Sequence, residues 1–114
     1  MELEYSELEN NIRLIKLIGK LDIAGAAAIQ TKFAAHCSGE RPRVLVDLSL
    51  LEFLASIGIQ LLVVNAKSVV SRGGRMVLLC PNAEIREELD VTGIPGIIPV
   101  YEGAESAETV LLAS

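Results

Sequence analysis

The sequence predicts an α/β fold with one mixed, mainly parallel sheet of about five strands and about four helices packed against it. Two observations lead to this prediction. After two leading strand-like segments, short apolar runs alternate with segments of helical spacing. The breaks between these segments fall at Gly, Pro and Asn residues, which favour turns. Since 114 residues with 51% hydrophobic content suit one core, we expect a single domain over residues 1–114.

The first third of the chain predicts a hairpin followed by a helix. Residues 2–8 alternate charged and apolar side chains, as a half-exposed edge strand does. Residues 12–18 alternate Ile and Leu with Arg and Lys, and are the expected partner strand. Asp22 stands where an N-cap is expected for an alanine-rich helix over residues 24–37, which Gly39 ends.

The middle third predicts a buried strand, a connection and a second helix. Residues 44–48 are apolar and rich in valine, which is typical of a strand covered on both faces. We expect Asp47 and Ser49 to end this strand and residues 50–54 to form the connection. The helix opens at residues 55–58 and stops at Gly73-Gly74. Apart from one polar stripe the helix is nearly all apolar, which predicts that it is mostly buried; the stripe is Gln60, Lys67, Ser68 and Ser71.

The last third predicts two more strands and two more helices. Residues 76–79 form an apolar strand that Pro81-Asn82 halts, and residues 83–91 follow with a helical pattern. After a turn at Pro95-Gly96, residues 97–100 are the expected last strand. Residues 104–113 predict a final amphipathic helix.

Charge and hydropathy exclude two classes of partner. The net charge of −5 argues against nucleic acids and anionic membranes. The close basic pairs, Arg41 with Arg43 and Arg72 with Arg75, flank predicted strand starts, so we expect solvated loop ends there. Since no apolar run approaches the ~20 residues of a membrane helix, we also expect no direct membrane insertion.

Two features of the sequence indicate the same cellular compartment. The first ten residues lack the basic and apolar regions of a signal peptide. Cys37 and Cys80 make no disulfide framework, and both are expected to be buried or semi-buried thiols in a reducing compartment. The sequence therefore predicts a cytoplasmic protein.

Ser56 is the residue with the clearest functional potential, and it has two interpretations. As a plain N-cap, its side chain would accept a hydrogen bond from a backbone N–H group and contribute about 1 kcal/mol of stability. As a phosphoacceptor, it would place a phosphoryl group against the free N–H groups and the positive dipole end of a helix. The fold would tolerate that group, and its added charge would act at an interface.

No catalytic constellation can be assembled from the other polar residues. Asp47 would suit the phosphoacceptor of a receiver domain, but Asp22 stands alone where that site needs an acidic pair, and residues 97–100 bring no lysine. His36 is the only histidine and has no co-ligands at metal-binding spacing. The Gly-x-Ser-x-Gly, P-loop and Gly-x-Gly-x-x-Gly motifs are absent. We therefore expect no enzyme activity, no metal and no cofactor.

Four segments, in the right order along the chain, resemble the signature of the STAS domain, as found in bacterial anti-sigma factor antagonists. The first is Asp47-Leu48-Ser49 with Phe53 and the helix start at residues 55–58. The others resemble the family's Gly-x-Leu-Asp strand end, its Gly-Gly strand start and the close of its third helix; they lie at residues 17–22, 72–78 and 91–94.

The resemblance implies that Ser56 is phosphorylated by a partner kinase, as family members are on the matching serine. One departure bears on this expectation. The family's Asp before the serine is Ala55 here, and its second Ser is Ile57. The missing carboxylate would remove a contact to the kinase or to its nucleotide-bound metal, or it would mean that this chain binds a partner without being phosphorylated.

The resemblance further implies a regulator of transcription that works by partner switching. It would be a phosphoprotein that binds an anti-sigma factor, itself a serine kinase, as a monomer or weak dimer. The alternative is a stand-alone STAS accessory subunit of a membrane transport or signalling complex, without phosphoregulation. The expected partner-binding residues surround the serine: Asp22, Ala24, Ala55, Ser56, Ile57, Gly58 and Gln60.

Overall fold

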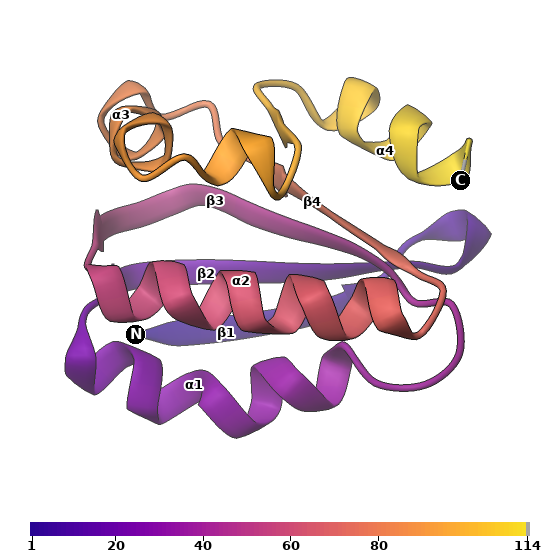
Figure 1. The fold of residues 1–114 in the computed structure, drawn as a ribbon, viewed down its shortest axis with the longest axis horizontal. Coiled ribbons are helices and arrows are strands. Elements are labelled where there is room, and N and C mark those ends of the chain that lie inside the picture. Colours follow the sequence, from indigo (N-terminus) through magenta and orange to yellow (C-terminus); the bar gives the residue numbers. More distant parts are fainter. Residues whose placement is uncertain (114) are drawn as a thin grey trace.

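The computed structural model describes residues 1–113 and contains one five-stranded sheet (Figure 1). The strands lie in the order of the chain: β1 (Glu2–Glu7), β2 (Ile12–Leu21), β3 (Arg43–Leu54), β4 (Arg75–Leu79) and β5 (Val100–Tyr101). β1 and β2 are antiparallel, and every later pair is parallel. This confirms the predicted mixed, mainly parallel sheet with its leading hairpin.

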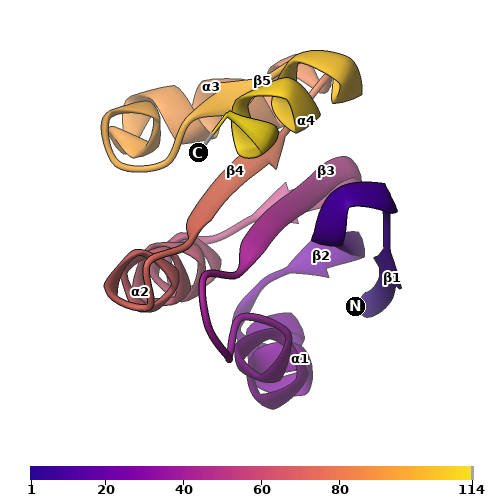
Figure 2. The ribbon, with the colours of Figure 1, turned by 90° about the vertical axis from the view of Figure 1, so that its right-hand side faces the viewer.

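Helices cover both faces of the sheet (Figures 1 and 2). α1 (Ile23–His36) and α2 (Ser56–Ser71) lie side by side on one face, while α3 (Ala83–Val91) and α4 (Ala104–Leu112) lie on the other. A short 3-10 turn, Glu9–Asn11, closes the β1–β2 hairpin. None of the helices formed by residues 1–113 combines the length and hydropathy needed to span a membrane.

Alternate side chains of β3 enter two hydrophobic clusters. Val44, Val46 and Leu48 belong to the larger cluster, which includes the buried residues of α1 and α2. Leu45 points to the opposite face and belongs to the cluster that includes the buried face of α4. Burial on both faces explains why this strand is a continuous apolar run.

β3 is longer than the sequence predicts, so the expected connection over residues 50–54 is wrong. Those residues continue the strand and pair with the end of β2, with Leu50 opposite Ile18 and Leu54 opposite Leu21. Two register shifts interrupt the pairing. Asp47 does not end the strand; its carboxylate accepts a hydrogen bond from the Ser49 N–H at 2.9 Å beside the irregular segment.

The last strand also differs from the expectation of residues 97–100. β5 spans Val100–Tyr101, and Ile94–Gly96 forms a 3-10 turn before it. The N–H groups of Ile97 and Ile98 both donate to the Ile94 carbonyl at 2.8 Å, so these residues continue the turn. Isoleucine favours strands by propensity, and here the turn at Pro95 overrides it.

α2 is more exposed than its apolar sequence predicts. Its buried residues form one stripe along the helix: Gly58, Leu62, Asn65, Ala66 and Val69. Ile57, Val64 and Val70 are exposed. Asn65 is buried although it is polar, and its side-chain amide donates to the Leu61 carbonyl at 2.8 Å. A helix on the surface of a sheet buries only the stripe that faces it, and the outward apolar residues of α2 are left uncovered.

Candidate functional site

α1 and α2 begin at the same end of the sheet, beyond the carboxyl ends of the parallel strands β2 and β3 (Figure 1). The Ala55 N–H donates to the Leu21 carbonyl at 3.0 Å and ties the start of α2 to the end of β2. In parallel sheets this edge is where ligand and partner sites are usually built. The structure thus places Ser56 at the expected edge.

Two glycines set both helix starts tightly against the end of β2. A Cβ atom on Gly25, the third residue of α1, would lie 2.2 Å from the Lys20 carbonyl oxygen. A Cβ atom on Gly58, the third residue of α2, would lie 2.6 Å from the Leu21 Cγ atom. Since neither position has room for a side chain, the first turn of each helix has a fixed place on the sheet.

The two helix starts are capped differently. Asp22 is the N-cap of α1, as predicted, and its Oδ1 accepts from the Gly25 N–H at 2.8 Å. Ala55 is the N-cap of α2 and offers no side-chain acceptor. The interpretation of Ser56 as an N-cap is therefore wrong, because Ser56 is the first helical residue. Its side chain is exposed, and its hydroxyl has no hydrogen-bond partner among residues 1–113.

A groove of about 460 Å³ runs past Ser56, between the end of β3, the start of α2 and α3. It is lined by Glu52, Phe53, Leu54, Ala55, Ser56, Ile59, Glu84, Ile85, Glu88 and Thr92. Three of these residues are exposed glutamates, one from β3 and two from α3. The surroundings of the serine hydroxyl are therefore acidic on the side of α3.

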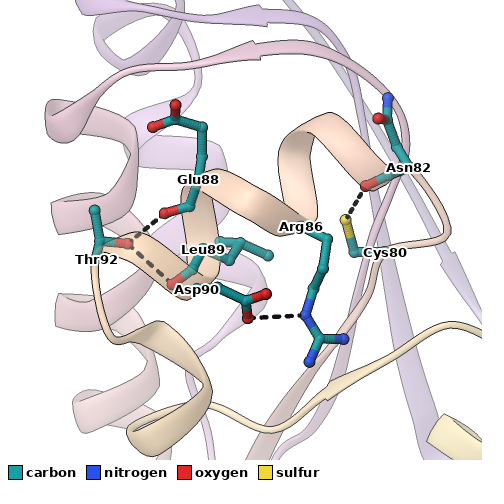
Figure 3. A network of polar contacts seen from close by, with 7 residues as sticks. All are labelled: Cys80, Asn82, Arg86, Glu88, Leu89, Asp90 and Thr92. Carbon is teal, nitrogen blue, oxygen red and sulfur yellow. Dashed lines mark hydrogen bonds and ion pairs between the residues drawn. The ribbon is translucent and has the colours of Figure 1, made fainter.

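α3, one wall of this groove, is held by its own polar contacts (Figure 3). Asn82 caps the helix, accepting from two N–H groups of the first turn, and its amide donates to the Leu51 carbonyl of β3 at 3.5 Å. Arg86 and Asp90 form an ion pair at 3.1 Å one turn apart. The Thr92 hydroxyl donates back to the carbonyls at the end of the helix. These contacts hold the backbone of α3, which carries two of the groove's glutamates.

The structure brings the predicted partner-binding residues together at one end of the molecule. The exposed members are Ala24 in α1 with Ser56, Ile57 and Gln60 in α2. The other three serve the fold: Asp22 caps α1, Gly58 is buried against β2, and Ala55 is half-buried. The exposed members therefore make up the accessible part of this surface.

Sequence reasoning missed the three glutamates of the Ser56 groove, Glu52, Glu84 and Glu88. The two from α3 lie about thirty residues beyond Ser56, and their helical pattern is that of any solvated helix face. Only the packing of α3 beside the end of β3 brings them to the serine.

The remaining titratable candidates lie away from this site or are buried. His36 stacks on Tyr5 with ring centroids 3.8 Å apart, and burial together with the nearby Arg13 charge lowers its pKa. Cys37 and Cys80 are buried free thiols, as predicted. Burial raises the pKa of Cys37 to about 11 and also raises the pKa of Cys80, which disfavours thiolate chemistry at both.

Comparison with known proteins identifies a family and several similar folds. The model of the STAS domain matches residues 6–107. BtrV of Bordetella bronchiseptica, which carries the name of an anti-sigma factor antagonist, is 29% identical over 91 residues, covering 80% of this chain and 78% of that protein. Its match spans most of both chains.

Solved structures share the fold over nearly the whole chain. An anti-sigma-factor antagonist (STAS) domain protein from Planctomyces limnophilus superposes with a TM-score of 0.85 at 27% identity, covering 96% of each chain. The Bacillus cell fate determinant SpoIIAA, solved in its phosphorylated form, has a TM-score of 0.69 at 19% identity, covering 96% of this chain and 99% of that one.

Proposed function

The chain belongs to the STAS domain family, and we propose that it is an anti-sigma factor antagonist whose binding is switched by phosphorylation of Ser56. In this proposal the partner is an anti-sigma factor that is also a serine kinase. The unmodified chain binds it and the phosphorylated chain is released. The chain itself has no enzymatic role, and since the reaction consumes ATP, the proposal places it in the cytoplasm. The name of BtrV supports the class of partner.

The observation that carries the proposal is the exposed, unengaged hydroxyl of Ser56 on the first residue of an uncapped helix. A serine that capped α2 would have a structural reason to be there. This hydroxyl makes no such contact, so it is available to a kinase. The phosphorylated form of SpoIIAA adds support, because it shows that this type of fold accepts a phosphoryl group.

The first turn of α2 would accommodate a phosphate without unfolding. Its N–H groups and the positive dipole end of the helix favour an anion, and no side chain of Ala55 competes for them. On the other side of the serine the charged side chains that line the groove are all carboxylates, from Glu52, Glu84 and Glu88. The added charge of about −1.5 to −2 therefore stays at the surface, where it acts on the partner.

The phosphorylation step places a demand on the kinase. The Ser56 oxygen attacks the γ-phosphorus of kinase-bound ATP, the bond to the β-phosphate oxygen breaks, and ADP leaves. The hydroxyl proton passes to a base. Since Ala55 supplies no carboxylate next to the acceptor, we expect the kinase to provide that base and every protein ligand of its nucleotide-bound metal.

Titration of the purified partner against three forms of the chain tests the proposal. Ser56→Asp should bind at least about 30-fold more weakly than wild type, because a charge placed at an interface centre costs about 2 kcal/mol or more. Its melting temperature should move by less than about 4 °C. Ser56→Ala should bind like wild type and resist release by ATP. Wild type should gain one phosphate at Ser56, detected by mass spectrometry.

Ser71→Asp is the matched control, because Ser71 is an exposed serine at the other end of the same helix. It should bind like wild type. Equal affinities for the wild-type, Ser56→Ala and Ser56→Asp forms would remove Ser56 from the interface. A loss of affinity that follows a loss of stability would do the same.

Ala55 favours a second candidate function, a stand-alone STAS subunit that docks permanently in a transport or signalling complex. The family's carboxylate beside the acceptor is absent here, and such a subunit has no use for it. Stable binding that ATP never reverses, with no phosphate on Ser56, would favour this role.

A further inference from the structure

The outer faces of α1 and α2 differ from the rest of the surface in their charge. The chain has 15 acidic residues, and none lies within either helix. Apart from His36, the only charged side chains of these two helices are Lys32 and Lys67. By contrast, α3 and α4 carry acidic residues along their length. A partner that approaches α1 and α2 therefore meets a surface without negative charge.

A groove of about 210 Å³ lies between α1 and α2 on this face. Its lining includes Ala26 and Gln30 of α1 with Ile57, Leu61 and Val64 of α2. The three α2 residues are spaced four and three apart, so they form one apolar stripe along the helix. Ile57 is 40% exposed and Val64 is 59% exposed. Apolar side chains gathered on an uncharged groove are typical of an interaction site.

The groove is continuous with the Ser56 surface. Ile57 follows Ser56 directly, and Gln60, one turn on, also lines the groove. A protein that covers the Ser56 hydroxyl therefore lies next to the part of the groove that Ile57 and Gln60 line. Because a helix rises by about 1.5 Å per residue, Val64 lies about 12 Å from Ser56 along the axis.

We propose that this groove, hereafter the α1–α2 groove, takes an amphipathic helix of the anti-sigma factor. The inference rests on the proposed function, because it assigns the same partner a second contact. A third helix fits the furrow between two packed helices by inserting an apolar ridge. Its flanks carry neutral or acidic residues, since the charged side chains of α1 and α2 outside His36 are the two lysines.

A second copy of the chain is the less suitable occupant. In a two-fold dimer through this face, α1 and α2 of each copy would bring lysines and His36 as their charged side chains and no carboxylate to pair with them. The acidic faces of α3 and α4 on a second copy present carboxylates in place of an apolar stripe.

Two exposed valines of α2 make a matched test. Val64 is 59% exposed and lines the α1–α2 groove; Val70 is 64% exposed and lies outside it, beside Arg75 and Pro99. Valine and aspartate have similar helix propensities. Val64→Asp should weaken binding of the purified partner by about 30-fold or more. Val70→Asp should leave the affinity within about threefold of wild type, which is below the effect of a central contact.

Hydrogen exchange on the wild-type chain gives a second readout. Partner binding should slow amide exchange over residues 57–64 and the facing part of α1. Melting curves and light scattering on each variant separate binding from unfolding and from self-association. A Val64→Asp variant that binds like wild type would overturn the proposal, and so would equal losses for both valine variants.

The outcomes separate this proposal from the one on Ser56. A wild-type chain that binds no anti-sigma factor defeats both. If Ser56→Asp removes binding but Val64→Asp does not, the proposed switch at Ser56 stands and the proposed docking in the α1–α2 groove is overturned. A wild-type dimer that Val64→Asp converts to a monomer assigns the groove to a second copy and overturns the proposed occupant.

Discussion

The starts of α1 and α2 have the same backbone arrangement but differ in their N-caps. Each follows a strand of the parallel part of the sheet, and each has a glycine as its third residue, pressed against the end of β2. α1 begins at Asp22, whose carboxylate accepts from the Gly25 N–H. α2 begins at Ala55, which has no side-chain acceptor, and the next residue exposes its hydroxyl.

The difference means that the cap stabilises the start of α1, whereas the start of α2 remains available to a ligand. A side-chain cap contributes about 1 kcal/mol of stability. α2 lacks such a cap, although α1 has one at the same end of the fold. Departures from good local chemistry in natural proteins tend to fall at functional sites. The uncapped start of α2 therefore supports the proposal that Ser56 is the functional residue of this end of the fold.

The largest expected effect comes from filling the close approach at either helix start. Gly25→Ala should destabilise the fold by about 3 kcal/mol, because the new Cβ would meet a backbone carbonyl that cannot move aside. Gly58→Ala should cost less, about 1–2 kcal/mol, since the Leu21 side chain can shift in part. Urea unfolding followed by circular dichroism measures both. A gain of about 1 kcal/mol, the helix propensity of Ala over Gly, would show that the helix start has room.

Removing the cap of α1 comes next. Asp22→Ala should lower the free energy of unfolding by about 1 kcal/mol, because the Gly25 N–H loses its acceptor. Asp22→Asn is the control and should keep most of the stability, since Asn caps helices as well as Asp does. Equal losses for Ala and Asn would assign the effect to the charge of Asp22, and no loss would show that water replaces the cap.

Adding a cap to α2 should have an effect of opposite sign. Ala55→Asp should raise the free energy of unfolding by about 0.5–1 kcal/mol, because residue 55 already has the extended backbone of an N-cap. Thermal and urea unfolding measure the gain, and Ala55→Asn separates the hydrogen bond from the charge. A variant no more stable than wild type would mean that the N–H groups of α2 already have equivalent partners in water.

The smallest expected effect is at Ser56 itself. Ser56→Ala should change the free energy of unfolding by less than about 0.5 kcal/mol, because the hydroxyl makes no contact that stabilises the fold. The matched comparison is Asp22→Ala, at the cap of the sister helix. A loss near 1 kcal/mol at Ser56 would show that the serine caps α2 in solution, and the two helix starts would then no longer differ in kind.

Sequence patterns correctly predicted the elements whose ends are set by residues nearby in the chain. The helix over residues 83–91 has the predicted bounds, because Asn82 caps it and Gly93 follows in the left-handed conformation. The capping role of Asp22 was predicted correctly for the same reason. The α/β class, the leading hairpin and the buried thiols also follow from periodicity and composition, which report how each segment meets the core.

The tertiary structure decided what depends on neighbours distant in the sequence. Pairing with β2 carries β3 through Leu50 and Leu54, and a hydrogen bond to the Leu21 carbonyl helps set the start of α2 at Ala55. The sequence of α2 is apolar on nearly all sides, so only its docking on the sheet determines that Val64 faces outward. Likewise, the glutamates of α3 reach the Ser56 groove through packing alone. Secondary-structure propensity depends on a few neighbouring residues, whereas packing against the whole sheet determines which face of a helix is buried.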